Sequence, residues 1–470
     1  MWNLIKYKNN RALVDDSGLT ITYEMLYEET MKMSKVINTR CTVLVLCSNK
    51  IGSIVGYVGF LNNKIVPIMI NSNMQNELVQ NLIDMYYPSY LWVPDELDIN
   101  YTNCIAVYSC YGYKLLQMNY SKEYELNNQL CILMATSGST GSPKFVRQSY
   151  NNILENAKSI VEYLGLDETE KPITTLPMNY CYGLSIINSH LLVGATILVT
   201  DKGILQREFW DFFKKEEATS FGGVPYTYEM LNKIRFYNMN LPSLRYCTQA
   251  GGKLTSNLHR KFAEYAVCSQ IKFIVMYGQC EATARMGYLP ADKALEKCGS
   301  MGIAIPGGKF FLIDADGNEI NKPDVTGELV YEGPNVTMGY AECADDLING
   351  DDRKGILYTG DMAQIDKEGF YYIVGRKKRF LKIYGNRVNL DAVDQLIKMR
   401  FNNIECVCSG IDDHMYIFLL DSTIAEEVRA YVTITTKLNP KAFSVNVIDE
   451  IPKTDAGKIL YGELSKYYKN

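Results

Sequence analysis

Nine consecutive residues, 136–144, hold the side chains best suited to chemistry in this chain. They comprise five hydroxyl residues, two glycines, a proline and a lysine, namely Thr136, Ser137, Gly138, Ser139, Thr140, Gly141, Ser142, Pro143 and Lys144. An apolar run at residues 131–135 precedes them and predicts a buried strand. Glycines allow backbone N–H groups to converge on one point, hydroxyls add donors, and the lysine adds a positive charge. The segment is therefore predicted to bind an anion, and a polyphosphate is its natural ligand.

The spacing of this segment differs from two common phosphate loops. A P-loop needs glycine, four residues and then Gly-Lys-Ser/Thr, but counting from Gly138 the second glycine position is Pro143, and Phe145 follows the lysine. No G-x-G-x-x-G dinucleotide fingerprint follows the predicted strand. Taken alone, the segment fits a Ser/Gly-rich surface loop equally well, so its assignment depends on the rest of the sequence.

Six further segments place glycine, hydroxyl and charged residues at predicted turns. They are residues 250–253, 277–283, 299–307, 327–340, 358–376 and 452–459. Together with residues 136–144, their order and spacing resemble the adenylate-forming superfamily of AMP-dependent synthetases and ligases. Its members are acyl-CoA and aryl-CoA synthetases, peptide-synthetase adenylation domains and luciferases. The resemblance covers about residues 10–465 and rests on seven motifs in order rather than on any single one.

The resemblance implies a reaction in two halves. A carboxylate attacks the α-phosphate of ATP, which gives acyl-AMP and pyrophosphate. A thiol, of CoA or of a carrier-protein phosphopantetheine, then displaces AMP. The implied ligands are therefore ATP, Mg²⁺, a small carboxylic acid, and CoA or a carrier protein acting in trans.

The resemblance also implies which residues bind the nucleotide. Residues 136–141 and Lys144 would hold the β- and γ-phosphates, since positioning and charge neutralisation dominate such catalysis. Tyr277 would face the adenine, and Asp361 would accept both ribose hydroxyls. Glu281 would bind Mg²⁺, because a hard cation prefers carboxylate oxygen. The remaining implied nucleotide contacts are Gly251, Gly252, Gly278, Gln279, Cys280 and Arg376.

Two lysines near the C-terminus match further family positions. Lys458 resembles the catalytic lysine that bridges the substrate carboxylate and the α-phosphate. Lys378 falls at the hinge, where a backbone rotation swings the small domain between two poses. Two other positions depart from the family pattern. Cys280 replaces a usual threonine, and a thiol is a weak donor, while Tyr461 replaces a usual arginine.

The acid pocket is predicted around residues 176–184. In relatives that adenylate α-amino acids, an aspartate in this segment pairs with the α-ammonium, but Cys181 stands at about that position. A buried ammonium without a counter-charge is costly, so an α-amino acid is disfavoured. We expect an uncharged carboxylic acid of modest size. The predicted wall residues are Tyr180, Cys181, Tyr182, Tyr226, Gln249 and Ala250, although packing alone explains Tyr180 and Tyr182 equally well.

The composition argues against several other classes of protein. The chain has 470 residues, 47% hydrophobic and 21% charged, with a net charge of −5, so no nucleic-acid surface is indicated. The longest apolar stretch, residues 51–70, is interrupted at 62–64, so no membrane span is predicted. Thirteen dispersed cysteines and three isolated histidines argue against a zinc site and a Ser-His-Asp triad. The cysteines and the lack of a signal region predict a reducing cytoplasm.

The elements that position these residues follow from periodicity. Short apolar runs alternate with amphipathic segments through the first two-thirds of the chain, which predicts an α/β fold. The fold would have a large N-terminal domain of mostly parallel sheets flanked by helices, then a β-rich subdomain after residue 309 with a turn at Asp316-Gly317. A small mobile α+β domain would follow. We expect residues 1–376 to bind ATP and the acid, and residues 377–470 to carry the catalytic lysine.

Two alternatives to an acid–thiol ligase remain open at this point. Cys280 and Tyr461 would suit a catalytically weakened adenylate-binding partner or sensor, whereas the intact Lys458, Glu281 and Asp361 argue against it. The second alternative is an oxygenase that acts on its own acyl-adenylate, as in luciferases.

Overall fold

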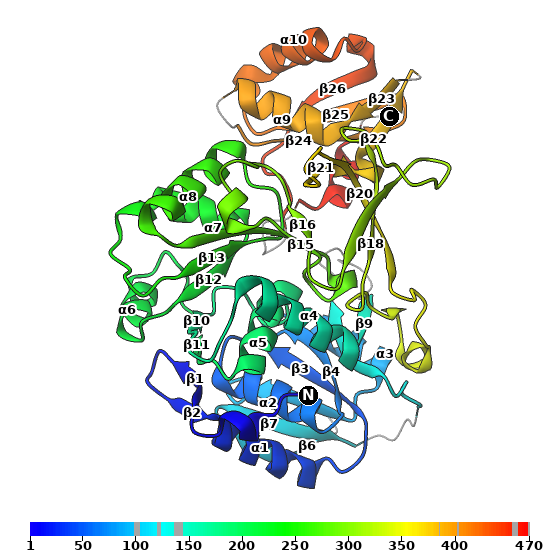
Figure 1. The fold of residues 1–470 in the computed structure, drawn as a ribbon. Helices are drawn as coiled ribbons and strands as arrows, with labels where there is room; N and C mark the ends of the chain where they lie inside the picture. Colours follow the sequence, from blue (N-terminus) through cyan, green and yellow to red (C-terminus); the bar gives the residue numbers. More distant parts are fainter. Residues whose placement is uncertain are drawn as a thin grey trace. The chain divides into compact units, whose positions relative to one another are not determined.

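The chain packs as two compact units. The computed structural model describes residues 1–97, 104–119, 124–135, 144–384, 386–401, 404–453 and 459–468. The first unit comprises residues 1–309 and 331–357, and the second comprises residues 310–330 and 358–470. Figure 1 shows the elements of both units.

The first unit contains two large sheets with parallel centres and antiparallel edges. In the described residues, the nine-stranded sheet has the order β16 (Ile303–Ala304), β15 (Gly287–Tyr288), β14 (Lys272–Tyr277), β13 (Tyr246–Gln249), β12 (Ser220–Gly223), β10 (Pro172–Ile173), β11 (Ile197–Val199), β1 (Arg11–Asp15) and β2 (Thr20–Thr22). Strands β14 to β1 of this order run parallel, and the pairs at both ends run antiparallel.

The second sheet of this unit has eight strands in the described residues. Their order is β19 (Gly339–Ala341), β9 (Phe145–Ser149), β8 (Leu130–Ala135), β4 (Val66–Asn71), β3 (Thr42–Cys47), β5 (Tyr90–Pro94), β7 (Tyr113–Met118) and β6 (Cys104–Cys110). Strands β8, β4, β3 and β5 are parallel. Strand β8 ends one residue before the predicted anion-binding loop.

Helices cover both faces of this second sheet. The helices of the first unit are α1 (Tyr23–Val36), α2 (Ile51–Asn62), α3 (Asn76–Tyr86), α4 (Tyr150–Leu164), α5 (Cys181–Val193), α6 (Arg207–Lys215), α7 (Pro225–Lys233) and α8 (Ser256–Ser269). Along β3, Val43 and Val45 join the core formed with α2, whereas Leu44 and Leu46 join the core formed with α3. A strand buried on both faces reads as a continuous apolar run, as β3 does.

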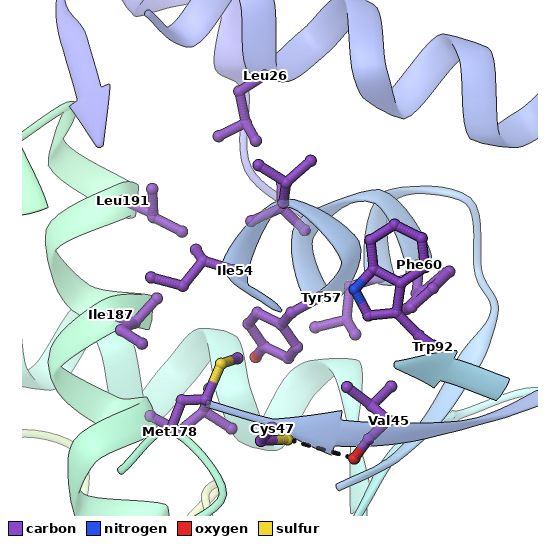
Figure 2. Close-up of a cluster of buried hydrophobic side chains, with 14 of the residues drawn as sticks. Leu26, Val45, Cys47, Ile54, Tyr57, Phe60, Trp92, Met178, Ile187 and Leu191 are labelled. Carbon is purple, nitrogen blue, oxygen red and sulfur yellow. Dashed lines mark hydrogen bonds between the residues drawn. The ribbon is translucent and has the colours of Figure 1, made fainter. Parts of the chain in front are cut away.

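Helix α2 is the centre of the larger core. All its residues from Ile51 to Leu61 are buried, as expected for a helix that is apolar on every side. Figure 2 shows Ile54 and Tyr57 of α2 facing Ile187 and Leu191 of α5. The tyrosine hydroxyl also donates to Asn188 Oδ1 at 2.8 Å. This core therefore fixes α5, which begins in the predicted acid pocket.

The second unit is smaller and, in the described residues, mixes hairpins with three α-helices. One sheet has the order β17 (Lys309–Ile313), β18 (Gly327–Glu332), β20 (Ile356–Ile365) and β21 (Tyr371–Arg376). Beyond it lie the hairpin β22 (Phe380–Ile383) and β23 (Asn386–Asn389), the sheet β24 (Cys406–Ile411), β25 (His414–Leu419) and β26 (Phe443–Val447), and helices α9 (Leu390–Arg400), α10 (Ala425–Thr436) and α11 (Tyr461–Leu464).

The predicted α/β class is confirmed, including the β-rich region and the small α+β region after it. The turn at Asp316-Gly317 is present, with Gly317 at φ 88°. One segment differs from the expected alternation, because β6 and β7 form an antiparallel hairpin beside β5. The second unit begins at residue 310 rather than 377. Compactness does not test which part moves, so the division at residue 376 stays a prediction. No helix in the described ranges is long and apolar enough to cross a membrane.

Candidate active site

The end of β14 and the turn after it carry five consecutive residues of the predicted nucleotide site, residues 277–281. A Cβ atom at Gly278 would lie 1.6 Å from the carbonyl oxygen of Ala284, so only glycine fits there. Ala284 itself has φ 133°, a backbone region that residues with side chains rarely adopt. Such strain persists only where the surroundings enforce it, and it concentrates at functional sites. Half-buried Tyr277 accepts a hydrogen bond from Gln279 Nε2 at 3.2 Å.

Glu281 is held by Tyr340, which also contacts two cations. The Tyr340 hydroxyl donates to Glu281 Oε1 at 2.8 Å. Lys144 Nζ lies 4.1 Å from the centre of the Tyr340 ring, and Arg353 Cζ lies 4.7 Å from it. Arg353 Nη1 donates to the Glu281 carbonyl oxygen at 2.9 Å. Burial and the neighbouring Glu281 carboxylate raise the Tyr340 pKa to about 12, so the hydroxyl stays a donor at neutral pH.

The carboxylate of Glu281 fits a magnesium ligand. In the described part of the chain, a hydrogen bond reaches Oε1 but none is made to Oε2. Among the described residues, no group of three or more Asp, Glu, His or Cys side chains could hold a metal ion. Mg²⁺ keeps several waters and is commonly bound by one or two carboxylates plus phosphate oxygens. Glu281 therefore suits an ion that arrives with ATP.

Cys280 packs beside the last residue of β8. Its Sγ is 3.9 Å from the carbonyl oxygen of Ala135, the last residue before the predicted phosphate loop. Its carbonyl oxygen accepts from Gln148 Nε2 at 3.5 Å. The thiol packs against the large core, which suits its character as a small hydrophobe. Cys280 therefore contacts the last residue of β8, and its contact with the nucleotide stays a prediction.

Tyr182 and Tyr180 stand together at the start of α5. The Tyr182 hydroxyl is bonded to Thr248 Oγ1 at 2.8 Å, and the two tyrosine rings are 6.3 Å apart. A Cβ atom at Gly251, whose φ is 82°, would lie 2.6 Å from the Tyr180 hydroxyl. Cys181, the first residue of α5, is half-buried. Tyr180 therefore borders the glycine turn predicted to bind the nucleotide, and Tyr182 lies behind it against Thr248 of β13.

Gln249 is placed differently from Tyr182. Gly222 and Gly223 of β12 pair with Thr248 and Gln249, and Cβ atoms at these glycines would meet Tyr182 of α5 and Thr227 of α7 respectively. Since side chains alternate along a strand, Gln249 faces α7 rather than α5. Its Nε2 donates to the carbonyl oxygens of the turn after β13, at 3.2 Å and 2.7 Å. In the described residues its Oε1 is buried without a partner.

The other two wall residues differ in their surroundings. Tyr226 is on α7 and 57% exposed, while Ala250 is buried after β13 in the core that contains Tyr182 and packs against Tyr180. The structure therefore brings Tyr180 and Tyr182 together but not with Gln249 and Tyr226. The substrate contacts of all six residues stay predictions.

Arg285 is a site residue that the sequence analysis missed. It follows the strained Ala284, is 2% exposed, and lies over the Tyr182 ring with Cζ 5.3 Å from the ring centre. Nε donates to Ser185 Oγ at 3.0 Å, and Nη1 donates to the Tyr163 hydroxyl at 2.9 Å. A single arginine between Ala282 and Leu289, in an otherwise uncharged stretch, is the signal that could have found it.

The second unit holds the predicted ribose residue. Asp361 is 2% exposed on β20, and its Oδ1 pairs with Nε of Arg376 on β21 at 2.7 Å. The strands align these two residues directly opposite each other. Arg376, which is more than half exposed, thus supplies the counter-charge that a buried carboxylate needs.

The predicted hinge lies in a short turn of this unit, and hydrogen bonds join the two segments that flank the turn. Lys378 falls within the 3-10 turn Lys377–Arg379. Asn389 Nδ2 donates to the Val374 carbonyl oxygen at 2.8 Å, and the Arg376 N–H donates to Asp391 Oδ2 at 3.1 Å. These bonds join the end of β21 to the start of α9 across the turn.

Tyr461 has a structural partner in the same unit. The buried Arg379 bonds Asp391 Oδ1 at 2.8 Å and Asp394 Oδ2 at 2.7 Å. Its Cζ lies 4.1 Å from the centre of the Tyr461 ring. Burial raises the Asp394 pKa to about 6, although the guanidinium opposes that shift. The tyrosine that replaces the family's arginine therefore covers an ion-pair network.

Two predicted parts of the site lie outside the described residues. They are residues 136–143, with Thr136, Ser137, Gly138, Ser139, Thr140 and Gly141, and residues 454–458, with Lys458. The residues that flank the second segment, Lys453 and Ile459, pair as an isolated antiparallel bridge.

Comparison with known proteins agrees with this fold. The sequence profile of the family described as AMP-binding enzyme matches residues 2–341. The chain is 28% identical over 369 residues to a peroxisomal OPC-8:0-CoA ligase of Arabidopsis thaliana, covering 74% of the chain and 66% of the ligase. It is 25% identical over 471 residues to a long-chain-fatty-acid–CoA ligase of Bacillus subtilis, covering 94% and 76%. The matches thus span about two-thirds to three-quarters of these relatives.

The solved structures show the same fold. An O-succinylbenzoate coenzyme A synthetase of Bacillus subtilis in complex with AMP has a TM-score of 0.79 at 20% identity, covering 98% of this chain and 97% of that one. The profile match and the fold define an adenylate-forming protein. The chain belongs to the family of AMP-binding enzymes.

Proposed function

We propose that this protein is an AMP-forming acid–thiol ligase. It activates a carboxylic acid as acyl-AMP, releases pyrophosphate and transfers the acyl group to a thiol. The observation that carries this proposal is the cluster of Glu281 and Lys144 on Tyr340, in a chain of the AMP-binding enzyme family. CoA is the favoured thiol, because the similar proteins are named as CoA ligases. A carrier protein in trans is the alternative.

The residues divide the work as follows. Lys144 and residues 136–143 neutralise the charge that develops on the leaving pyrophosphate. Glu281 holds Mg²⁺, which as a Lewis acid polarises phosphate oxygens. Asp361 orients the ribose through its hydroxyls. Lys458 stabilises the transition state between the carboxylate and the α-phosphate, so it acts in the first half-reaction.

Similarity to these relatives does not identify the acid substrate. Similar proteins are named for a long-chain fatty acid, oxalate, 2-succinylbenzoate and ferulate, at 25–27% identity. That range includes apolar, aromatic and doubly charged acids. The residues of this chain's acid pocket must therefore determine which acid is bound.

The test is ATP–pyrophosphate exchange with a panel of acids, in the wild type and in Lys458→Ala. We expect the variant to lose exchange by about 100- to 1,000-fold, the usual loss for a group that stabilises developing charge. ATP binding, measured by titration calorimetry, should persist. Thioester formation from supplied acyl-AMP should also persist, because Lys458 acts in one half-reaction only. Lys453→Ala, which removes a surface ion pair with Glu405 in the same segment, is the matched control.

Exchange that survives near the wild-type rate in Lys458→Ala would refute the assigned role. A wild-type protein that binds ATP but exchanges pyrophosphate with no acid would instead be the weakened adenylate-binding partner or sensor. Exchange followed by AMP release on adding CoA separates CoA from a carrier thiol.

A further inference from the structure

Arg285 is a buried cation that the nucleotide chemistry above does not use. Its side chain lies among α4, α5 and β14, through contacts with Tyr163, Ser185 and Met276. Its neighbours are hydroxyls, a thioether and the Tyr182 ring, and no carboxylate in the described residues forms an ion pair with it. Arginine stays protonated in proteins, and a buried charge without a counter-ion is strongly disfavoured.

The hydrogen bonds of this guanidinium are incomplete. Arginine has five N–H donors in a planar fork. Nε and Nη1 bond to Ser185, Tyr163 and the sulfur of Met276, whereas no hydrogen bond from Nη2 is made to any described residue. A planar fork with free donors is the arrangement that recognises a carboxylate, often through two parallel bonds.

Two tyrosines lie in sequence between the Gly251 turn and Arg285. Tyr180 is next to the turn, since a Cβ atom at Gly251 would lie 2.6 Å from its hydroxyl. Tyr180 is 6.3 Å from Tyr182, measured between ring centres, and Tyr182 is followed by Arg285. If the reacting carboxylate meets the nucleotide near the Gly251 turn, the far end of the acid points toward Arg285.

We propose that the acid substrate carries a second carboxylate, which pairs with Arg285. This inference rests on the ligase function proposed above and names its substrate class. It replaces the expectation of an uncharged acid, which rested on the six predicted wall residues and did not weigh Arg285. It strengthens the argument against α-amino acids, because a guanidinium beside the pocket repels an ammonium.

The experiment compares matched acids in pyrophosphate exchange. Malonate, succinate, glutarate, adipate and phthalate are each paired with the monocarboxylate of the same chain or ring, from propionate to hexanoate, and benzoate. In the wild type, at least one dicarboxylate should exceed its partner in kcat/KM by about 30-fold or more, the usual effect of completing a buried charge pair. This comparison requires no variant, so it does not depend on how a substitution folds.

Arg285→Met then tests the residue, with Arg285→Lys as the charge-conserving control. Methionine should remove the preference for the dicarboxylate, mainly through KM, and lysine should restore part of it. A purely structural arginine would alter stability in both variants and leave the preference between acids unchanged. Wild-type exchange that favours monocarboxylates overturns the inference and leaves the ligase function standing. Exchange with no acid, despite ATP binding, overturns both.

Discussion

Among single residues, Tyr340 does the most to organise the site. Its ring lies against Lys144 and Arg353, and its hydroxyl meets Glu281. One side chain thus links Lys144, the last residue of the predicted phosphate loop, to the predicted metal ligand. An outer-shell donor of this kind fixes the orientation of the ligating carboxylate.

Tyr340→Phe is expected to weaken metal binding while keeping both cations in place. Phenylalanine retains the ring but removes the donor to Glu281. Because outer-shell substitutions commonly cost 10- to 100-fold in metal affinity, we expect at least about a tenfold loss. Electron paramagnetic resonance of Mn²⁺ binding in the presence of a non-hydrolysable ATP analogue measures this directly.

Tyr86→Phe is the matched control for this substitution. Its hydroxyl donates to the carbonyl oxygen of Ala341, beside Tyr340, at 2.9 Å. It should leave Mn²⁺ affinity unchanged. Equal Mn²⁺ affinity in Tyr340→Phe and the wild type would show that Glu281 does not depend on this hydroxyl.

The sequence could identify some of these residues but not others. Glu281 and Lys144 were named because the family motifs include them, and the structure gathers them on Tyr340. Arg353 and Arg285 belong to no motif quoted from the sequence. Their importance depends on which residues packing places beside them, and a single sequence does not contain that information.

At the level of elements, α5 and β13 are joined by a buried histidine. His190 Nε2 is bonded to the Tyr246 hydroxyl at 2.9 Å, and its Nδ1 to the Ile186 carbonyl oxygen at 2.8 Å. The side chain is 2% exposed. Burial lowers the His190 pKa from 6.5 to about 4. The hydrogen bond to the Ile186 carbonyl oxygen opposes this shift, and the positive charge of Arg285 adds to it. The folded protein therefore holds this histidine neutral.

This histidine should make stability depend on pH. Between pH 6.5 and about 4 the unfolded chain binds a proton that the folded chain does not, so the free energy of unfolding falls as pH falls through that window. The loss attributable to His190 is on the order of 3 kcal/mol, from about 1.4 kcal/mol for each pH unit. Urea unfolding of the wild type and His190→Gln at several pH values measures it. Parallel curves for the two proteins would contradict the assignment.

An apolar run in the sequence predicts a strand well where the strand is buried along its whole length. The strand predicted at residues 131–135 coincides with all but the first residue of β8. The face of Gln249 was not predictable, because residues 246–249 are buried on both sides and no polar alternation marks either face. Only the pairing with Gly223 reveals that this side chain meets α7.

At the level of the whole molecule, the proposed cycle needs two half-reactions on one chain. The predicted pivot is Lys378, in the turn after β21. Asn389 and Asp391 bond backbone groups of Val374 and Arg376 across this turn. A rotation about the pivot must therefore break these bonds, so the described arrangement of the second unit is held by specific contacts.

Lys378→Pro should separate the two half-reactions. Proline fixes φ near −65°, so the backbone at residue 378 can no longer rotate freely between poses. If the described pose suits adenylation, pyrophosphate exchange should remain within a few-fold of wild type. Thioester formation, followed by stopped-flow mixing of preformed acyl-AMP with CoA, should fall by roughly 100-fold, equivalent to about 3 kcal/mol. Lys378→Ala, which keeps backbone rotation, should leave both steps near wild type. An equal loss of both steps in the proline variant would indicate local misfolding, and unchanged thioester formation would place the pivot elsewhere.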